Sequence, residues 1–370
     1  MEDYIRYANK VAFLKPIDGD ILNKFDGVVR NGKFFVDFFI KADKKEKVFI
    51  NGEKAEFTDG LFKATLPVID GENVFKAEAD GDIDEVHVYK TERTISKYRL
   101  SSDDNIIFLA NINKNKDVYK SIFDDPYLSV YKKAHDLYGT KVHLNIYYSM
   151  PEHPDFSEKR NYFDLSMMTD KFKSEWEDNS EWLKLNFHAY ADKPDKPYIA
   201  SDYNSVRDDC ERVIKEIKRF AGEKTLSEET TIHWGATTKE GVKAVRDSGI
   251  RVLAGYFKIE GANTVVSYHY PKSLVRYLES RDFWYDRRLG MYYAKIDNVL
   301  NLHTPKEIEG LMNVLFVDKQ RSGFVEIMIH EEYFYKDYVA YLPDFAERVF
   351  TACRFLFEKG YKSSFLADVL

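Results

Sequence analysis

Short apolar runs separated by glycine and Asp-Gly turns fill the first 95 residues of the chain. The runs recur every 8–12 residues and are rich in Val, Phe and Ile, which is typical of strands rather than helices. They lie at about 10–19, 32–42, 47–52, 60–68, 73–81 and 85–90. We therefore predict a small all-β sandwich over residues 1–95.

The pattern changes after a polar stretch at 96–104, which we interpret as a linker. Apolar strand-like runs then alternate with amphipathic helical segments. The predicted strands are 105–113, 141–148, 181–190, 230–236, 251–257, 294–301, 324–332 and 363–369, and the helices are 126–138, 202–221, 238–248, 305–319 and 343–359. Such alternation predicts an α/β fold, a distorted (β/α)7-8 barrel over 105–370. The irregular, aromatic stretch 258–293 is expected to form a hairpin lid over one barrel end.

Net charge and the length of the apolar runs argue against nucleic-acid-binding and membrane proteins. The formal net charge is −7 and no basic block occurs, so no nucleic-acid partner is expected. No apolar run reaches the roughly 20 residues of a membrane helix, so no membrane partner is expected either. The N-terminus lacks a signal-peptide pattern, which predicts a cytoplasmic protein as the sequence stands, or an extracellular one if a leader has been removed. The oligomeric state is left open.

Polar side chains gather at the predicted strand ends. In a parallel barrel the active site lies at the carboxyl ends of the strands, so these side chains are expected to share one mouth. They are Asn111, Asn113, His188, Tyr190, Asp192, His233, Trp234, Asp297, His330 and Glu331. Three histidines flanked by carboxylates and aromatics favour a hydrolytic or metal site, although any one of them could be structural, and Trp234 could equally be a packing residue.

Part of the N-terminal region resembles a known accessory domain. A strand ending at Asn51-Gly52, then the segment 59–62 (DGLF), then Gly71 and Asn73 two residues later is similar to small bacterial Ig-like domains attached to carbohydrate enzymes. The resemblance implies a fold and no activity of its own.

The second region resembles the polysaccharide deacetylase (NodB-homology) family. The segment WLKLNFHAYAD is similar to the family's strand that ends in a histidine, and VEIMIHEEYF is similar to its late histidine motif. The resemblance implies a divalent metal, usually zinc, in a carbohydrate-deacetylating barrel. It makes His188 a metal ligand and His330 the general acid. Where the family has a second histidine four residues on, this chain has Asp192, whose carboxylate at that spacing can also bind a metal.

The family's first motif is a pair of aspartates after the first strand, one a ligand and one the base. Asp124-Asp125 is a tempting match, but no strand precedes it, and Asp125 before Pro126 is typical of a helix N-cap. If 105–113 is the first strand, Asn111 and Asn113 stand in place of the pair. We then expect His188, Asp192 and Asn113 to hold the metal.

Without that aspartate pair, the acid–base and substrate-binding roles need other residues. Asp297 and Glu331 are the candidates to act beside His330, and Tyr190, His233, Trp234 and Asn111 the candidates to bind substrate. Three hypotheses follow. The first is a metal-dependent deacetylase acting on an acetylated sugar or polysaccharide. The second is a metal-independent glycoside hydrolase, which would need paired carboxylates in the mouth. The third is a catalytically degenerate barrel that binds glycans.

Overall fold

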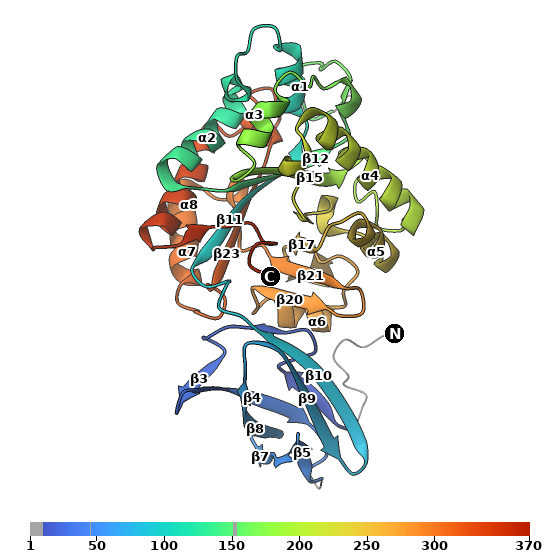
Figure 1. Cartoon of the computed structure of the whole chain (residues 1–370), viewed down its shortest axis with the longest axis vertical. Helices are drawn as coiled ribbons and strands as arrows, with labels where there is room; N and C mark the ends of the chain where they lie inside the picture. The colour runs from blue at the N-terminus through green and yellow to red at the C-terminus, as the bar shows by residue number, and fades with distance from the viewer. Residues whose placement is uncertain (1–9, 45, 151–153) are drawn as a thin grey trace.

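The computed structural model describes residues 10–44, 46–150 and 154–370. An all-β N-terminal region lies at one end of the molecule, and a larger region of strands and helices lies at the other (Figure 1). No helix in the described part of the chain is long and apolar enough to cross a membrane.

Two five-stranded sheets make up the N-terminal region. One has the order β1-β4-β8-β7 with β3 beside β4, and the other has the order β2-β10-β9-β5-β6. The strands are β1 (Ala12–Lys15), β2 (Ile21–Leu22), β3 (Gly27–Arg30), β4 (Lys33–Lys41), β5 (Val48–Ile50), β6 (Glu53–Lys54), β7 (Glu56–Thr58), β8 (Leu61–Val68), β9 (Gly71–Ala79) and β10 (Asp82–Lys90). Alternate residues of β4, β8 and β10 are buried and share one apolar core with β5 and β9. The all-β prediction is confirmed, while the Ig-like assignment stays a prediction.

The larger region contains two sheets of mostly parallel strands. One has the order β15-β12-β11-β23-β22, with β24 also paired to β11, and the other has the order β16-β17-β21-β20. The strands are β11 (Lys97–Asn105), β12 (Val142–Tyr147), β15 (Leu183–Ala189), β16 (Glu229–Thr230), β17 (Val252–Gly255), β20 (Phe283–Asp286), β21 (Met291–Lys295), β22 (Asn298–Val299), β23 (Phe324–His330) and β24 (Lys362–Ser363). Within these two sheets, only β20 runs antiparallel to its neighbour.

All five predicted helices are present. They are α2 (Pro126–Tyr138), α4 (Tyr203–Phe220), α5 (Lys239–Asp247), α7 (Pro305–Leu315) and α8 (Phe345–Glu358), and they pack around the strands (Figure 1). On α4 the apolar side chains at three- and four-residue spacing are the buried ones. Asp125 caps α2 by accepting from the N–H groups of Tyr127 and Leu128, with Pro126 at the first helical position. The N-cap interpretation of Asp125 is therefore confirmed.

The strands do not close into one hydrogen-bonded barrel among the described residues. Residues 291–299 pair first with β17 and then with β23, so this segment belongs to both sheets in turn. On the other side, a single bridge joins Leu185 to Leu226. The α/β prediction is confirmed. The predicted closed barrel is not, because the strands form two separate sheets.

The prediction of a linker at 96–104 is wrong, because this stretch forms the central strand β11. Two of its polar residues, Arg99 and Ser101, are buried because they face an internal ion network. Arg99 is fully buried and donates to Glu326 and Glu229, and Ser101 also donates to Glu326. A strand whose inward face is polar lacks the alternation that identifies a half-buried strand.

The prediction of a first strand at 105–113 is also wrong, because this stretch contains the helix α1 (Ile107–Lys114). Glu331 explains the helix, because its carboxylate accepts from the backbone N–H groups of Ile106, Ile107 and Phe108 at 2.6, 2.9 and 2.6 Å. These N–H groups at a helix start have no partner within the helix. The cap comes from a residue more than 220 positions away, so local sequence could not indicate it.

The excursion 258–293 contains the predicted hairpin and more. The hairpin is β18 (Lys258–Glu260) with β19 (Asn263–Val265), and the helix α6 (Lys272–Leu278) follows it. β20 then pairs with β21 and extends the second sheet.

A buried ion cluster joins the two regions. Arg281 is 4% exposed and contacts Asp26 at 2.6 Å and Asp20 at 3.4 Å, two carboxylates from the N-terminal region. Beside it, the Trp284 indole N–H donates to the Asp18 carbonyl. The N-terminal region is thus attached by buried side chains as well as by the chain.

Candidate metal centre

A cavity of about 490 Å³ opens at the carboxyl ends of the parallel strands. Asp103 and Asp104 reach it from β11, His188 from β15 and His330 from β23. His233 reaches it from a short turn that follows β16. A larger cavity of about 650 Å³, lined by residues such as Tyr89, Lys90 and Tyr292, has no comparable group of histidines.

A bulge at the end of β11 brings two consecutive aspartates into this cavity. In a regular strand neighbours point to opposite faces. Here the pairing with β12 jumps from Ser102–Leu144 to Asn105–Ile146, so β11 has one extra residue. The extra residue is accommodated at Asp104, whose φ is 64°. This is a left-handed conformation that aspartate tolerates better than most residues.

His188 lies at a second register shift. Ile146 pairs with Phe187, but Tyr147 pairs with Ala189, so His188 is the extra residue of β15. The imidazole is buried at 1% exposure. Bulges of this kind redirect side chains beside active sites.

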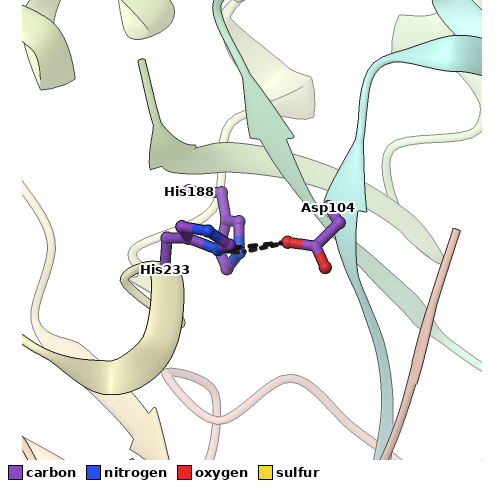
Figure 2. A group of neighbouring side chains, drawn as sticks. All are labelled: Asp104, His188 and His233. Atoms are coloured by element: carbon purple, nitrogen blue, oxygen red, sulfur yellow. Dashed lines mark hydrogen bonds and ion pairs between the residues drawn. The ribbon is translucent and has the colours of Figure 1, made fainter. Parts of the chain in front are cut away.

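Asp104, His188 and His233 form a compact group (Figure 2). Asp104 Oδ1 lies 3.0 Å from His188 Nε2 and 3.2 Å from His233 Nδ1. The two imidazole nitrogens are 3.2 Å apart. The residues are 84 and 45 positions apart along the chain, so only the folded sheet brings these three atoms together.

The other nitrogen of each histidine is held by a backbone carbonyl. His188 Nδ1 lies against the Thr231 carbonyl oxygen, and His233 Nε2 lies 3.1 Å from the Asp192 carbonyl oxygen. A carbonyl only accepts, so each of these nitrogens carries a proton and donates. The nitrogens that face Asp104 are therefore the ones free to offer a lone pair to a metal, the arrangement typical of metal-binding histidines.

The spacing of the three atoms fits a small divalent ion. A tetrahedral site with ligand bonds of 2.0–2.1 Å separates its ligand atoms by about 3.3 Å. The observed 3.0–3.2 Å needs an expansion of only a few tenths of an ångström. Two histidines and one carboxylate leave a position open, which is the pattern of catalytic rather than structural zinc.

The charges in the group support one another. Burial opposes ionisation of Asp104, yet hydrogen bonds from His188 and His233 hold its pKa well below the usual value. Burial likewise disfavours the charged form of His188, but the carboxylates of Asp103 and Asp104 outweigh it and raise the pKa of His188. Asp104 and His188 thus each favour the other's charged form.

Two further groups line the cavity with their orientation fixed. The first group is Asp103, whose Oδ1 accepts from Asn145 Nδ2 at 2.5 Å. The side-chain oxygen of Asn145, Oδ1, in turn accepts from the Thr231 N–H. His330 Nδ1 lies 2.9 Å from Asn301 Oδ1, which turns Nε2 toward Asp104 Oδ2 at 3.9 Å. Asp103 and His330 are paired residues of β11 and β23.

Of the ten residues singled out from the sequence, five line the cavity: His188, His233, Trp234, Asp192 and His330. Asp192 lies on the far side of His233, with Oδ1 3.6 Å from His233 Nε2, the nitrogen turned away from the group. His233, expected to bind substrate, instead offers the ligand atom that Asp192 was expected to supply. Trp234 is 45% exposed at the cavity and adopts a left-handed φ of 61°.

The structure places the other five elsewhere. Asn111 and Asn113 are on α1, where Asn113 Oδ1 accepts from the Thr169 N–H. Asp297 precedes β22 and is occupied by the Glu326 N–H and Lys295, and Glu331 caps α1. Tyr190 stacks on Tyr148 with ring centroids 5.3 Å apart. Apart from Asn111, the side chain of each has a partner outside the cavity.

Sequence reasoning missed the aspartate pair. Asp103-Asp104 follows the buried segment 97–102, and the family resemblance requires such a pair at the end of the first strand. The consecutive acids were the available signal, and the polar inward face of β11 concealed it. Tyr147, whose hydroxyl reaches Asp104 and His233, lies at the end of the predicted strand 141–148, but sequence reasoning assigned it no role.

Comparisons with known proteins give distant structural likenesses only. No family model matches the sequence, and no curated protein matches it. The chain is similar to a family 4 acetyl xylan esterase from Clostridium thermocellum bound to cobalt, at 10% identity and a TM-score of 0.38, over 74% of this chain and 89% of that one.

Two further solved structures are similar at the same level. One is the Xyl-CE4 domain of a xylanase from the hindgut metagenome of Trinervitermes trinervoides, with 9% identity, a TM-score of 0.36 and the same coverage. The other is a CE4 family pseudoenzyme from Bacillus anthracis, with 8% identity, a TM-score of 0.34, and coverage of 81% of this chain and 88% of that one. All three TM-scores are below 0.5, so these likenesses assign neither a family nor a function to this chain.

Proposed function

We propose that the protein is a metal-dependent carbohydrate deacetylase whose metal is held by Asp104, His188 and His233. The observation that carries the proposal is the histidine pair: each ring is fixed by a backbone carbonyl so that its other nitrogen meets the same carboxylate oxygen. Zinc is the ion that suits two imidazoles and one carboxylate best, and other divalent ions share these preferences.

Two residues of the chain take the proton-transfer roles. A bound divalent ion supplies Lewis acidity to an ester or amide carbonyl and lowers the pKa of water. Asp103, oriented by Asn145, accepts the proton of the attacking water. His330 donates to the leaving oxygen or nitrogen from Nε2, since Asn301 holds its Nδ1 proton.

The alternatives lose their support. A glycoside hydrolase using Asp297 with Glu331 or Glu332 would need both carboxylates of a pair in the cavity. Glu332 lines the cavity, but Asp297 and Glu331 are occupied by backbone N–H donors outside it. The degenerate glycan-binding reading depended on a missing aspartate pair, and Asp103 and Asp104 supply one.

Metal-stripped protein reloaded with Zn²⁺, Co²⁺ or Mn²⁺ provides the test. We expect acetate release from acetylated chito- or xylo-oligosaccharides, lost on chelation and restored by metal. His188→Ala and Asp104→Asn should abolish both metal retention and turnover, whereas His87→Ala, a histidine of the N-terminal region, should change neither. Unchanged activity in His188→Ala, or no metal bound by the wild type, would refute the proposal.

A further inference from the structure

We infer that Tyr147 is a positioning residue of this centre, whose hydroxyl fixes the metal-binding oxygen of Asp104. The inference rests on the proposed function, because it assigns a role toward the same metal. Tyr147 is the last residue of β12 and is 2% exposed, between the strands that carry Asp104 and His188.

The backbone around Tyr147 is irregular on both sides. β12 pairs with β11 across the bulge at Asp103-Asp104, and with β15 across the bulge at His188. Tyr147 lies where both shifts occur, so its ring is placed between the two redirected side chains. The ring centroid of Tyr147 is 5.2 Å from the His188 and His233 centroids.

The hydroxyl contacts the group at its centre. It donates to Asp104 Oδ1, the oxygen that both histidines also approach. It lies 2.9 Å from His233 Nδ1 and 3.4 Å from Asp192 Oδ1. A phenol has a single proton, and an ionised carboxylate is the strongest acceptor among these partners.

Asp104 is the one ligand whose orientation lacks a backbone partner. His188 and His233 are fixed by the carbonyls of Thr231 and Asp192. Among the described residues, no backbone N–H donates to the Asp104 carboxylate, whose partners are the histidines and Tyr147. Once the histidine nitrogens bind a metal they no longer donate, and Tyr147 remains to hold Oδ1.

Outer partners of metal ligands typically contribute 10–100-fold to metal affinity. We therefore expect Tyr147→Phe to bind Zn²⁺ about 10–100-fold more weakly, measured by competition with a chromophoric chelator at fixed pH. Tyr148→Phe is the matched control, since it removes the neighbouring hydroxyl from a ring stacked on Tyr190, and its affinity should equal that of the wild type. Thermal unfolding of the metal-free proteins shows whether each variant is folded.

Two results would overturn the inference. One is a folded Tyr147→Phe that binds Zn²⁺ within twofold of the wild type. The other is a phenolate-to-metal charge-transfer band when the wild type is loaded with Cu²⁺, because Tyr147 would then be a ligand instead of a donor to Asp104. If Tyr147→Phe does not fold, the Cu²⁺ spectrum decides, and absence of the band supports the hydrogen bond. A wild type that binds no Zn²⁺ at all would instead refute the proposed function.

Discussion

Replacing Glu331 by alanine should destabilise the protein strongly, because one buried carboxylate satisfies the start of α1. Glu331 is fully buried and accepts from three consecutive backbone N–H groups at 2.6–2.9 Å, and from the Tyr335 hydroxyl at 2.7 Å. Alanine removes the acceptor and leaves all four donors in the interior. Burial raises the pKa of Glu331 to about 7, so the negative charge that it carries at the helix N-terminus above that pH is lost as well.

The size of the effect follows from those donors. An unsatisfied buried donor costs about 1–3 kcal/mol, and loss of an ordinary N-cap about 0.5–2 kcal/mol. Since the helix start can shift and admit water, the full sum of four donors is an upper bound. We expect a loss of about 3–5 kcal/mol in the free energy of unfolding, similar to breaking a buried ion pair.

Urea unfolding followed by far-ultraviolet circular dichroism measures this loss. Glu307→Ala is the matched control: Glu307 also accepts a backbone N–H at a helix start, from Thr304 in a capping box, but on the exposed surface. Its loss should be much smaller than that of Glu331→Ala. A loss below about 1 kcal/mol for Glu331→Ala would refute the view that this cap determines the helix.

Three further predictions concern the site. Asp103→Asn should lower kcat about 10²–10⁴-fold with zinc content unchanged, because only the proton acceptor is lost; kinetics with elemental analysis checks this. Zinc affinity should fall as pH drops below the raised pKa of His188, about tenfold per pH unit, because a proton must leave the imidazole before the metal binds; chelator competition between pH 5 and 8 measures the slope. Trp234→Ala should raise KM about tenfold for an oligosaccharide but leave KM for a small acetyl ester unchanged, which steady-state kinetics on both substrates can separate.

Much of the architecture was predictable because burial follows regular periods. α4 and α8 each present one apolar stripe, and β12 and β15 alternate apolar with polar residues between helices. The two longest errors lie at 96–113, where burial and polarity are uncoupled; the predicted strand 363–369 is also wrong beyond Ser363. Arg99 is buried because Glu326 and Glu229 neutralise it, and both partners lie more than 100 residues away.

The candidate site was predictable in part for the same reason. His188 and His330 lie at or next to the carboxyl ends of seven-residue strands, so the sequence alone predicts that they reach the cavity. His233 follows a strand of only two residues, and Asp104 enters the cavity through a bulge. A shift of one residue in register exchanges the two faces of a strand, and single-sequence periodicity does not detect it.

The ion cluster between the regions has a consequence for how the protein unfolds. Separating the regions would leave Arg281 without Asp20 and Asp26, and would expose the Trp284 ring that is now 3% accessible. A buried aromatic side chain covers about 150–250 Å² at about 25 cal/mol per Å², so its exposure costs about 4–6 kcal/mol, a large share of the stability of one domain. The N-terminal sheets and the larger region should therefore unfold in a single cooperative transition, because each region buries side chains of the other.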